Sequence, residues 1–536
     1  MSIFTNSRRR PVLALYVLAA AIIVTTPVWY WHLSNKDSLP WRSRLPDAST
    51  RAPAWVPSPE PVRFPSDYDR SSDQEMCNRM FGPGYFEHIQ NHQHPYCKFS
   101  SSSSYLHCFS APRLPPPWAS MWSHERGDPI CIAKGVSFDP GSEKHFKAHC
   151  NARDFAAEFA SLSPPTGEDE IKPKRELEPT DPSTDIKDVP NLADLDVYWG
   201  GSGVGGEFQA NWDFATAVPG CDKNTNSDGV GGWLYVVRRE DTPNFWHKLM
   251  GLWQAMITLD AMQVARNPAT GKPWMTKQDV ESMRIVYDDN LGADPLDDWW
   301  KMLNGQEPAK ISTLPASCYD NVLIPLAGSS SPFWAALAEN VYHEPCQEQF
   351  LINAFRTRVF RHLNISPRDA VPNVDPVITL VNRTHNRKLY DADNLMAKVR
   401  AKYPNSKVNV VDFAKLDLRQ QVELAVNTDV FIGHHGAGMM HLFFLPPDAA
   451  VVEITSKSVR KFRSITRMRG IAHFEADCLE APDYEHAVHG TPLPDGWQAG
   501  ADDEHWQSRE YAYLIEEDFL GWVDAAVRNQ RNKRYR

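Results

Sequence analysis

The segment best suited to bind a ligand lies between two apolar runs in the C-terminal part of the chain. Val430–Ile432 reads as a buried parallel strand, followed by Gly433, two histidines and the turn Gly436–Gly438. An apolar helix is predicted from about Ala437 to Leu445, where two prolines end it. A strand, a glycine turn and a helix N-terminus aim amide N–H groups and roughly half a positive charge at one point. This suits a phosphate, although the same glycines could merely close a strand–helix–strand unit.

The C-terminal half alternates strands and helices around this segment. The predicted strands are 377–381, 408–412, 430–432 and 451–454, and the predicted helices are 392–402, 416–426 and 437–445. Four strand–helix steps within about 80 residues predict a doubly wound parallel sheet. A further amphipathic helix is expected over 511–528.

The preceding part of the chain has a similar alternation. Strands are predicted at 233–237, 284–287 and 322–326, and helices at 244–265, 294–303 and 347–363. Prolines cluster at 367–376, where we place a domain boundary. The fold class is therefore α/β, with two strand–helix halves and a cleft between them where strand ends converge. We assign residues 191–372 to the first half and 373–536 to the second.

Composition limits the class of protein. The chain has 536 residues, enough for two or three domains, and 42% of them are hydrophobic. Its net charge of −11 and the absence of a long basic stripe argue against a nucleic-acid binder.

The N-terminus predicts a membrane anchor. Pro11–Trp31 carries no charge, and its length corresponds to roughly 31 Å of helix, about one bilayer core. Three arginines precede it, which favours a cytosolic tail at residues 1–10 and a lumenal body. A proline-rich stem follows at 32–75. The alternative is a cleaved signal peptide, whose apolar region would usually be shorter.

The nine cysteines agree with a lumenal body. Five of them lie between Cys77 and Cys150, in a cysteine-rich region that we place at 76–190 together with a charged loop. No spacing typical of a zinc site occurs, so no metal site is expected. In an oxidising compartment most of the cysteines should form disulfides, with the pairing left open.

A resemblance covers the chain from about Trp233 onward. The segment Phe431–Gly438, together with Phe444-Leu445-Pro446 and Val452-Glu453, resembles the signature of the family 61 glycosyltransferases. The likeness is greatest to the subgroup of EGF-domain-specific O-linked N-acetylglucosamine transferases. The usual signature has one histidine before Gly-Ala-Gly; here His435 takes that place and His434 replaces a variable residue.

The resemblance implies a fold and a reaction. Family members have a GT-B arrangement of two Rossmann-like domains, invert the anomeric carbon and need no obligatory metal or other cofactor. The implied donor is a UDP-sugar, most of all UDP-N-acetylglucosamine, and the implied acceptor is Ser or Thr of a secreted or membrane protein. Transfer of xylose to a glycan is the alternative within the family. The implied location is the endoplasmic reticulum or the Golgi, as a single-pass type II membrane protein.

The resemblance also assigns donor-site residues. Arg383 and Arg387 match the family's nucleotide-binding arginines, and a guanidinium suits two phosphate oxygens. The amides of Gly436, Ala437 and Gly438 would share the diphosphate. Glu453 matches the position that holds the ribose hydroxyls, and His435 would line the phosphate site or cap the helix. Without the family match, the two arginines would read as solvated loop residues.

His247 is the predicted catalytic base. Asn244–His247 resembles the family's Asn-x-x-His helix start, and a histidine can accept a hydroxyl proton near neutral pH. Many relatives have an aspartate four residues later, where this chain has Gly251. Asp260, Asp241 or a loop carboxylate could serve instead. His247 could instead be a helix-face histidine packed under the cleft.

Two other readings remain open from sequence. A metal-dependent transferase would need an Asp-x-Asp motif, which occurs at 194–196 and 391–393, the latter at a predicted helix start. A non-catalytic lumenal carbohydrate-binding protein with the same fold would explain Gly251.

Overall fold

The computed structural model describes residues 75–98, 100, 104–112, 128–162, 186–215, 232–241, 244–337, 346–347, 349–369, 375–456, 462–478 and 511–535. All of them belong to the second of two compact units, Val62–Arg536. The predicted cytosolic tail, the span Pro11–Trp31, nearly all of the stem and most of the charged loop lie outside the described residues. No helix within the described ranges has the length and apolar character needed to cross a membrane.

The first sheet has nine strands and mixes two kinds of pairing. Its main path runs β1-β2-β3-β9-β6-β7-β8, with β4 beside β3 and β5 beside β4. The strands are β1 (Gln93–Pro95), β2 (Tyr105–Ser110), β3 (Pro129–Phe138), β4 (Phe146–His149), β5 (Trp212–Ala215), β6 (Trp233–Val237), β7 (Arg284–Tyr287), β8 (Ala309–Lys310) and β9 (Ser317–Ile324). Pairing is antiparallel from β1 to β9 and parallel from β9 to β8.

Helices accompany this sheet. They are α2 (Glu75–Phe81), α3 (Gly84–Asn91), α4 (Phe155–Leu162), α5 (Gly203–Asn211), α6 (Phe245–Val264), α7 (Lys277–Ser282), α8 (Asp297–Asn304), α9 (Pro332–Leu337) and α10 (Phe350–Leu363). The 3₁₀ turns η2 (Leu192–Asp194), η3 (Trp199–Gly201), η5 (Ile311–Thr313) and η6 (Gly328–Ser330) connect them. Helix α6 is apolar on nearly every side because other elements cover it all round.

The second sheet has five strands, all parallel, in the order β12-β10-β13-β14-β15. They are β10 (Ile378–Val381), β12 (Val408–Val411), β13 (Val430–His434), β14 (Ala450–Thr455) and β15 (Ala472–Asp477). Every residue of β13 and β14 is buried, which explains why Val430–Ile432 and Ala450–Val452 are entirely apolar. A short parallel pair, β11 (Lys388–Leu389) with β16 (Tyr511–Ala512), lies apart from this sheet.

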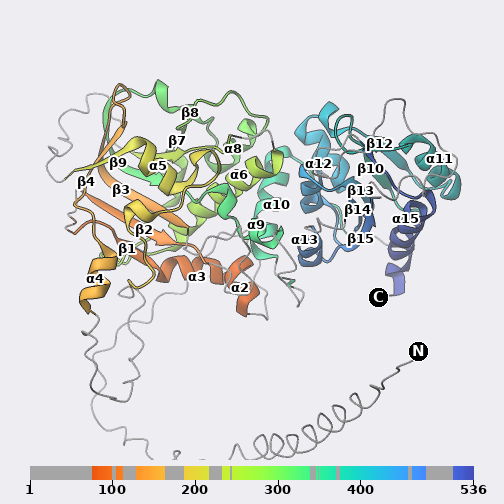
Figure 1. Cartoon of the computed structure of the whole chain (residues 1–536), viewed down its shortest axis with the longest axis horizontal. Helices are drawn as coiled ribbons and strands as arrows, with labels where there is room; N and C mark the ends of the chain where they lie inside the picture. The colour runs from red at the N-terminus through yellow and green to blue at the C-terminus, as the bar shows by residue number, and fades with distance from the viewer. Residues whose placement is uncertain are drawn as a thin grey trace, which may run out of the picture. The chain divides into compact units, whose positions relative to one another are not determined.

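Helices cover both faces of the five-stranded sheet. Figure 1 shows α11 (Ala392–Lys402) and α15 (Glu516–Arg531) on one side of its strands and α12 (Leu418–Val426) and α13 (Arg463–Met468) on the other. The 3₁₀ segments are η7 (Phe413–Lys415), η8 (Ala437–Phe444) and η11 (Asn532–Tyr535). The prediction of a doubly wound parallel sheet in this half is confirmed.

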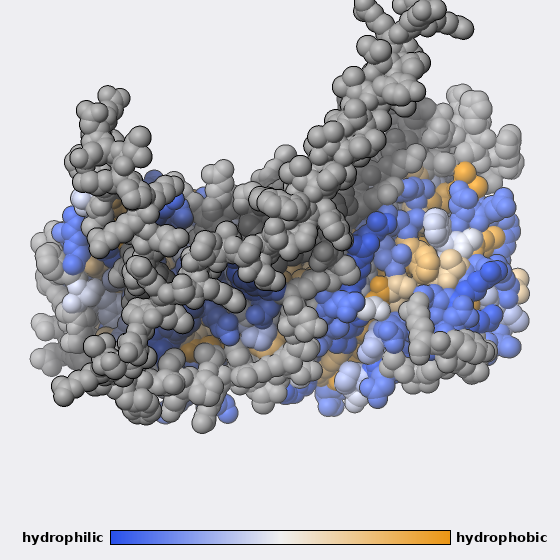
Figure 2. Space-filling model, turned by 90° about the horizontal axis from the view of Figure 1, so that it is seen from below, coloured by the Kyte–Doolittle hydropathy of each residue, from blue (hydrophilic) through white to orange (hydrophobic). Residues whose placement is uncertain are grey.

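The two halves share one hydrophobic core. Trp253 of α6 stacks on Phe355 of α10, with ring centroids 4.5 Å apart, and meets the edge of Phe443 of η8 at 5.1 Å. Burying such a ring contributes about 1.5–3 kcal/mol. On the face seen in Figure 2 the described surface is mostly hydrophilic, with apolar areas that are limited in extent. The apolar side chains therefore hold the α6 and η8 segments together.

Apart from shifts of element boundaries, the structure differs from the sequence prediction in three places. The helix predicted over 511–528 is preceded by strand β16 at Tyr511–Ala512, and α15 starts only at Glu516. The segment after Gly436 is a 3₁₀ helix rather than an α-helix. The cysteine-rich region is part of the first sheet, because β3 pairs with β9 along seven residue pairs. That half is therefore a mixed sheet whose parallel part is β9-β6-β7-β8, and no gap in the sheet marks the predicted boundary near residue 190.

Disulfides link parts of this half, as the cysteine content predicted. Cys97 bonds to Cys150 and Cys108 bonds to Cys131, both within the antiparallel part. Cys77 of α2 bonds to Cys346, which precedes α10. Cys318 is also disulfide-bonded.

Candidate active site

Two arginines from the loop after β10 converge on the glycine turn after β13. A Cβ atom on Gly436 would lie 3.1 Å from Nη1 and 3.2 Å from Nη2 of Arg387, and 3.5 Å from Nη1 of Arg383. Gly436 has φ of 142°, which side chains rarely adopt, so glycine is needed there for two reasons. Arg387 donates to the carbonyl of His435, and Nε of Arg383 donates to the carbonyl of Asn386 at 2.8 Å. The structure thus brings together three residues that the sequence predicted as one site.

The electrostatics of this site favour an anion. Burial, and then the charge of Arg383, lower the pKa of Arg387 to about 10. Burial also lowers the pKa of Arg383, although Asp412 opposes the shift. Two guanidiniums held close together and partly removed from water repel each other. A diphosphate would relieve both costs, because it brings negative charge and several acceptors.

Ala437 and Gly438 are the first residues of η8. A hydrogen bond from the N–H of Met439 to the carbonyl of Gly436, at 2.9 Å, closes its first turn. A Cβ on Gly438 would meet nothing within 4 Å. His441 packs inside the fold, and its Nδ1 lies 3.0 Å from Gly438 O. Burial lowers the pKa of His441 to about 4, so its ring is neutral and serves packing.

Glu453 lies between two histidines in the sheet. Its Oε1 is 2.6 Å from Nδ1 of His435, and its Oε2 is 3.0 Å from Nε2 of His473. Burial alone would raise the pKa of Glu453, but the two histidines beside its carboxylate outweigh burial and hold the pKa below its usual range. His473 also contacts Thr466 Oγ1 at 3.1 Å. Glu453 therefore orients His435, and its contact with a ribose stays a prediction.

The candidate base lies in the first turn of α6. Asn244 caps this helix, because its Oδ1 accepts the N–H of Trp246 at 3.0 Å. His247 is buried, and its Nδ1 lies 2.6 Å from Oε2 of Glu240. Oε1 of Glu240 accepts the N–H of Ser329 at 2.9 Å. The carboxylate beside the base is therefore Glu240, which the sequence analysis included only as an unnamed loop carboxylate.

The carboxylates named from sequence lie elsewhere. Asp260 forms an ion pair with Arg358 of α10, with Nη1–Oδ2 of 2.9 Å, so it is not the partner of His247, contrary to our expectation. Asp241 is exposed. At Gly251 the turn η6 lies close to α6: a Cβ on Gly328 would be 2.8 Å from Gly251 N. Glu240 follows β6 at its carboxyl end, which is the signal that could have identified it.

Aromatic rings surround the candidate base. The ring of His247 lies 4.5 Å from that of Trp199 and 4.4 Å from that of Trp334. Trp199 is 50% exposed. His247 and Glu240 also line a pocket at the ends of β6 and β9, together with Gly203, Glu207, Arg238, Lys248, Gly251, Leu326 and Gly328. The base is thus packed on one side and faces a pocket on the other.

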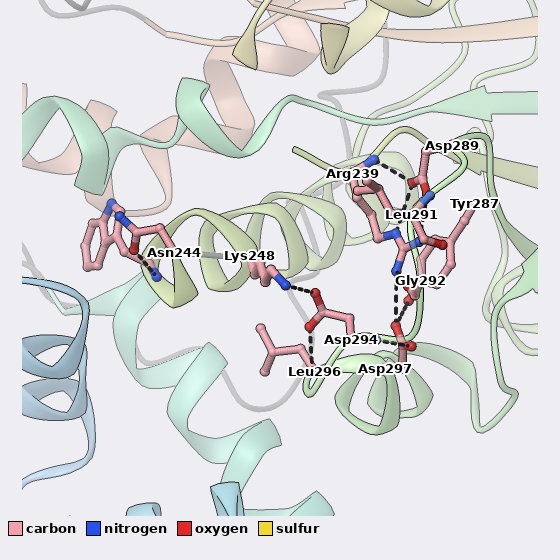
Figure 3. A network of polar contacts seen from close by, with 11 residues as sticks. Arg239, Asn244, Lys248, Tyr287, Asp289, Leu291, Gly292, Asp294, Leu296 and Asp297 are labelled. Atoms are coloured by element: carbon pink, nitrogen blue, oxygen red, sulfur yellow. Dashed lines mark hydrogen bonds and ion pairs between the residues drawn. The ribbon is translucent and has the colours of Figure 1, made fainter. Parts of the chain in front are cut away.

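Polar contacts fix the loops that carry this pocket, as Figure 3 shows. Arg239 forms an ion pair with Asp289 at 2.7 Å, and its guanidinium lies 3.9 Å from the ring centroid of Tyr287. Lys248 of α6 pairs with Asp294 before α8. The loops after β6 and β7 are therefore tied to each other and to the helix that holds the base.

Phe462 contacts His435 and Trp246, the residue that precedes His247 in the chain. Its ring lies 5.3 Å from His435 and 5.8 Å from Trp246, the neighbour of His247. Trp246 also stacks on Phe443 at 6.0 Å. The base and the arginine site are therefore separated by a short chain of ring contacts.

The two Asp-x-Asp triplets lie at different elements of the fold. Asp391 precedes α11, as predicted, and Asp194 ends the 3₁₀ turn η2. Within the described residues, no group of three or more His, Cys, Asp or Glu is arranged to hold a metal ion.

Comparison with known proteins gives matches in the same region. The glycosyltransferase 61 family model matches residues 245–452, from the start of α6 into β14. The EGF domain-specific O-linked N-acetylglucosamine transferase of Xenopus laevis is 36% identical over 131 residues, which are 24% of this chain and 25% of that protein. Its counterpart from Mus musculus is 36% identical over 129 residues, 24% of each chain. The Drosophila melanogaster protein is 25% identical over 205 residues, 37% of each chain. The matched part thus spans about a quarter of the first two relatives.

Proposed function

We propose that this chain, whose residues 245–452 match the glycosyltransferase 61 family model, is an enzyme that transfers a sugar from a UDP-sugar to a protein hydroxyl. The observation that carries this proposal is the convergence of Arg383 and Arg387 on Gly436. A cationic site at the end of a parallel sheet is where a nucleotide diphosphate binds in α/β folds. The His247–Glu240 pair, which ring contacts through Phe462, Trp246 and Trp334 connect to His435, supplies the base that such a transfer needs.

The reaction follows from these groups. The acceptor oxygen forms a bond to the anomeric carbon of the sugar while the bond from that carbon to the diphosphate oxygen breaks. The acceptor proton passes to Nε2 of His247, because Glu240 keeps the other ring nitrogen in the N–H form. The electron pair leaves with the diphosphate, whose growing negative charge Arg383 and Arg387 stabilise. Attack opposite to the leaving group inverts the anomeric carbon.

The finer parts of the proposal follow the family. The two sheets and the helices around them fit a GT-B arrangement, with the base on the first half and the diphosphate on the second. The donor we propose is UDP-N-acetylglucosamine, and the acceptor is Ser or Thr of a disulfide-rich secreted or membrane protein, which agrees with the names of the relatives. We further propose metal-independent transfer, because arginines supply the positive charge, and a lumenal body anchored through Pro11–Trp31 in the endoplasmic reticulum or Golgi.

A donor panel tests the function. The purified chain is incubated with UDP-N-acetylglucosamine, UDP-xylose, UDP-galactose and UDP-glucose, and released UDP is measured with and without a metal chelator. We expect slow UDP release with UDP-N-acetylglucosamine above the others, unchanged in chelator. Release that stops in chelator would disprove the metal-independent mechanism. If no UDP-sugar is bound or cleaved, the enzyme assignment is wrong.

A further inference from the structure

A buried histidine beside the arginine site has no role in the reaction described so far. His434 is the last residue of β13 and is 3% exposed. Neither of its ring nitrogens has a hydrogen-bond partner in the part of the chain that the structure describes. The residue paired with it on the neighbouring strand β14 is Ile454, which is apolar. Packing alone therefore gives no reason for an imidazole at this position.

A second unpaired polar atom belongs to the residue that follows β10, the strand beside β13. The last pair in the register of these two strands is Val381 with Gly433, and Asn382 and His434 are the residues that directly follow this pair in the chain. The backbone of Asn382 continues the sheet, because its N–H donates to Val411 O at 2.8 Å. The side-chain oxygen of Asn382 is buried and has no partner among the described residues. We call Asn382 and His434 together the sheet-end pair.

Leaving these atoms unpaired is costly. A buried polar group without a hydrogen bond destabilises a fold because it has lost its contact with water, whereas an apolar side chain of similar shape carries no such penalty. Such groups persist in native structures where they serve a ligand or a water molecule. The sheet-end pair lies beside the arginine site, since His435, the next residue, accepts a hydrogen bond from Arg387.

The chemistry of the pair defines the ligand. Burial, and then the charges of Arg383 and Arg387, lower the pKa of His434 to about 3, so its ring is neutral at pH 7. A neutral imidazole offers one donor and one acceptor, and the Asn382 oxygen offers a further acceptor. Diphosphate oxygens only accept at this pH, so they cannot satisfy the acceptors. The ligand must also donate, as ribose hydroxyls and the uracil imide do.

We propose that His434, with Asn382, binds the nucleoside part of the nucleotide whose diphosphate lies at Arg383, Arg387 and Gly436. This inference rests on the proposed function and divides the donor site into two parts. The arginines bind charge, and the sheet-end pair binds the neutral nucleoside through one donor and two acceptors.

Calorimetry with UDP and with pyrophosphate separates the two parts. His434→Leu removes both ring nitrogens and leaves an apolar side chain of similar size. We expect its UDP affinity to fall about tenfold, which is 1.4 kcal/mol, while its pyrophosphate affinity stays unchanged. Without ligand, its melting temperature should equal or exceed that of the wild type, because an unpaired polar group is gone. His434→Gln keeps one donor and one acceptor and should retain more UDP affinity than the leucine variant.

The outcomes are distinguishable from those of the proposed function. Wild-type protein that binds neither UDP nor pyrophosphate would overturn the proposed function itself. Wild-type protein that binds UDP while His434→Leu binds it equally well would overturn only this inference. Equal losses of UDP and pyrophosphate would also overturn it, since His434 would then support the arginine site rather than the nucleoside. If the leucine variant fails to fold, the glutamine variant decides: UDP affinity lost as fully as pyrophosphate affinity refutes the proposal.

Discussion

The two halves of the molecule each hold a histidine whose Nδ1 lies 2.6 Å from a buried carboxylate. In the first half the pair is His247 with Glu240, and in the second it is His435 with Glu453. The surroundings differ. His247 lies between two tryptophan rings and lines a pocket, whereas the backbone of His435 accepts a hydrogen bond from Arg387. The same pair of side chains thus occurs once among neutral rings and once beside cations.

The difference teaches what each pair is suited to do. A general base needs access to the substrate proton and a carboxylate that fixes the ring tautomer, and the first pair provides both. A residue beside a diphosphate site must be held in a fixed position close to the positive charges that bind the phosphates. Glu453 gives that rigidity, because it holds His435 and His473 at once. We therefore propose proton transfer for the first pair and support of the anion site for the second.

The largest effect is expected at the first pair. His247→Ala removes the proposed base, and turnover should fall roughly 10²–10⁴-fold, the usual contribution of general base catalysis. UDP affinity should stay unchanged, because His247 lies outside the arginine site. Sugar transfer and UDP calorimetry measure the two quantities. His362→Ala, at the end of α10, is the matched histidine control and should keep normal turnover. Normal turnover in His247→Ala would move the base elsewhere.

Substitution of Arg387, which donates to the backbone of His435, should weaken UDP binding rather than slow turnover. Arg387→Ala removes charge-assisted hydrogen bonds worth about 1.5–3 kcal/mol, so UDP affinity should fall roughly 10–100-fold. Arg400→Ala, exposed on α11, is the control for losing one positive charge from this half. Equal affinity of the Arg387 variant and the wild type would mean that the diphosphate lies elsewhere, and the comparison of the two halves would lose its basis.

Much of the second half could be predicted because local pattern determines it. The helix 392–402 was predicted with the bounds of α11, and the strand 430–432 lies within β13. Buried parallel strands are apolar throughout, so their residues alone reveal them. The antiparallel part of the first sheet was missed. Its strands pair over long sequence distances, such as β3 with β9, and cysteines and polar residues interrupt their pattern.

The residues of the candidate site were likewise predicted only in part. Arg383, Arg387 and Gly436 were predicted together because a family signature and one sheet edge bring them near each other. Glu240 was missed because it precedes His247 in the chain, outside the pattern that placed an aspartate after it. Asp260 was one of the alternatives named from sequence, but in the structure its carboxylate pairs with Arg358. Sequence spacing along one helix cannot reveal which neighbouring helix approaches.

A substitution in each carboxylate sharpens the comparison. Glu240→Gln removes the charge that orients His247, and turnover should fall about tenfold with UDP affinity kept, since such a hydrogen bond contributes roughly 1.5 kcal/mol.

Glu453→Gln should have the opposite profile, with weaker UDP binding and a lower melting temperature, because it weakens the contacts to two histidines. Transfer kinetics and calorimetry on both variants test this. Identical profiles would show that the two pairs do the same work.

The smallest effect is expected at a third carboxyl group near the first pair. Glu207 lines the same pocket as His247 and is almost fully buried. Burial, and then the charge of Asp288, raise the pKa of Glu207 well above its usual range. Asn211 donates to both carboxyl groups, at 3.1 Å to Glu207 and 2.7 Å to Asp288. The folded protein therefore holds a proton on Glu207 that the unfolded chain loses more easily.

This proton predicts the sign of a pH effect. A raised pKa contributes stability that is fully present below the ordinary glutamate value of 4.5 and is lost as pH rises toward the folded value. Glu207→Gln has no proton to lose, and its amide can still donate to Asp288. Its melting temperature should exceed that of the wild type by about 1 °C for each kcal/mol of unfolding free energy gained at pH 8, and the difference should shrink at pH 5. Glu87→Gln, exposed on α3, should show the same difference at both pH values. A Glu207→Gln effect that is larger at pH 5 than at pH 8 would mean that Glu207 is charged in the folded protein, so that the pocket around His247 is wetter than the ring contacts indicate.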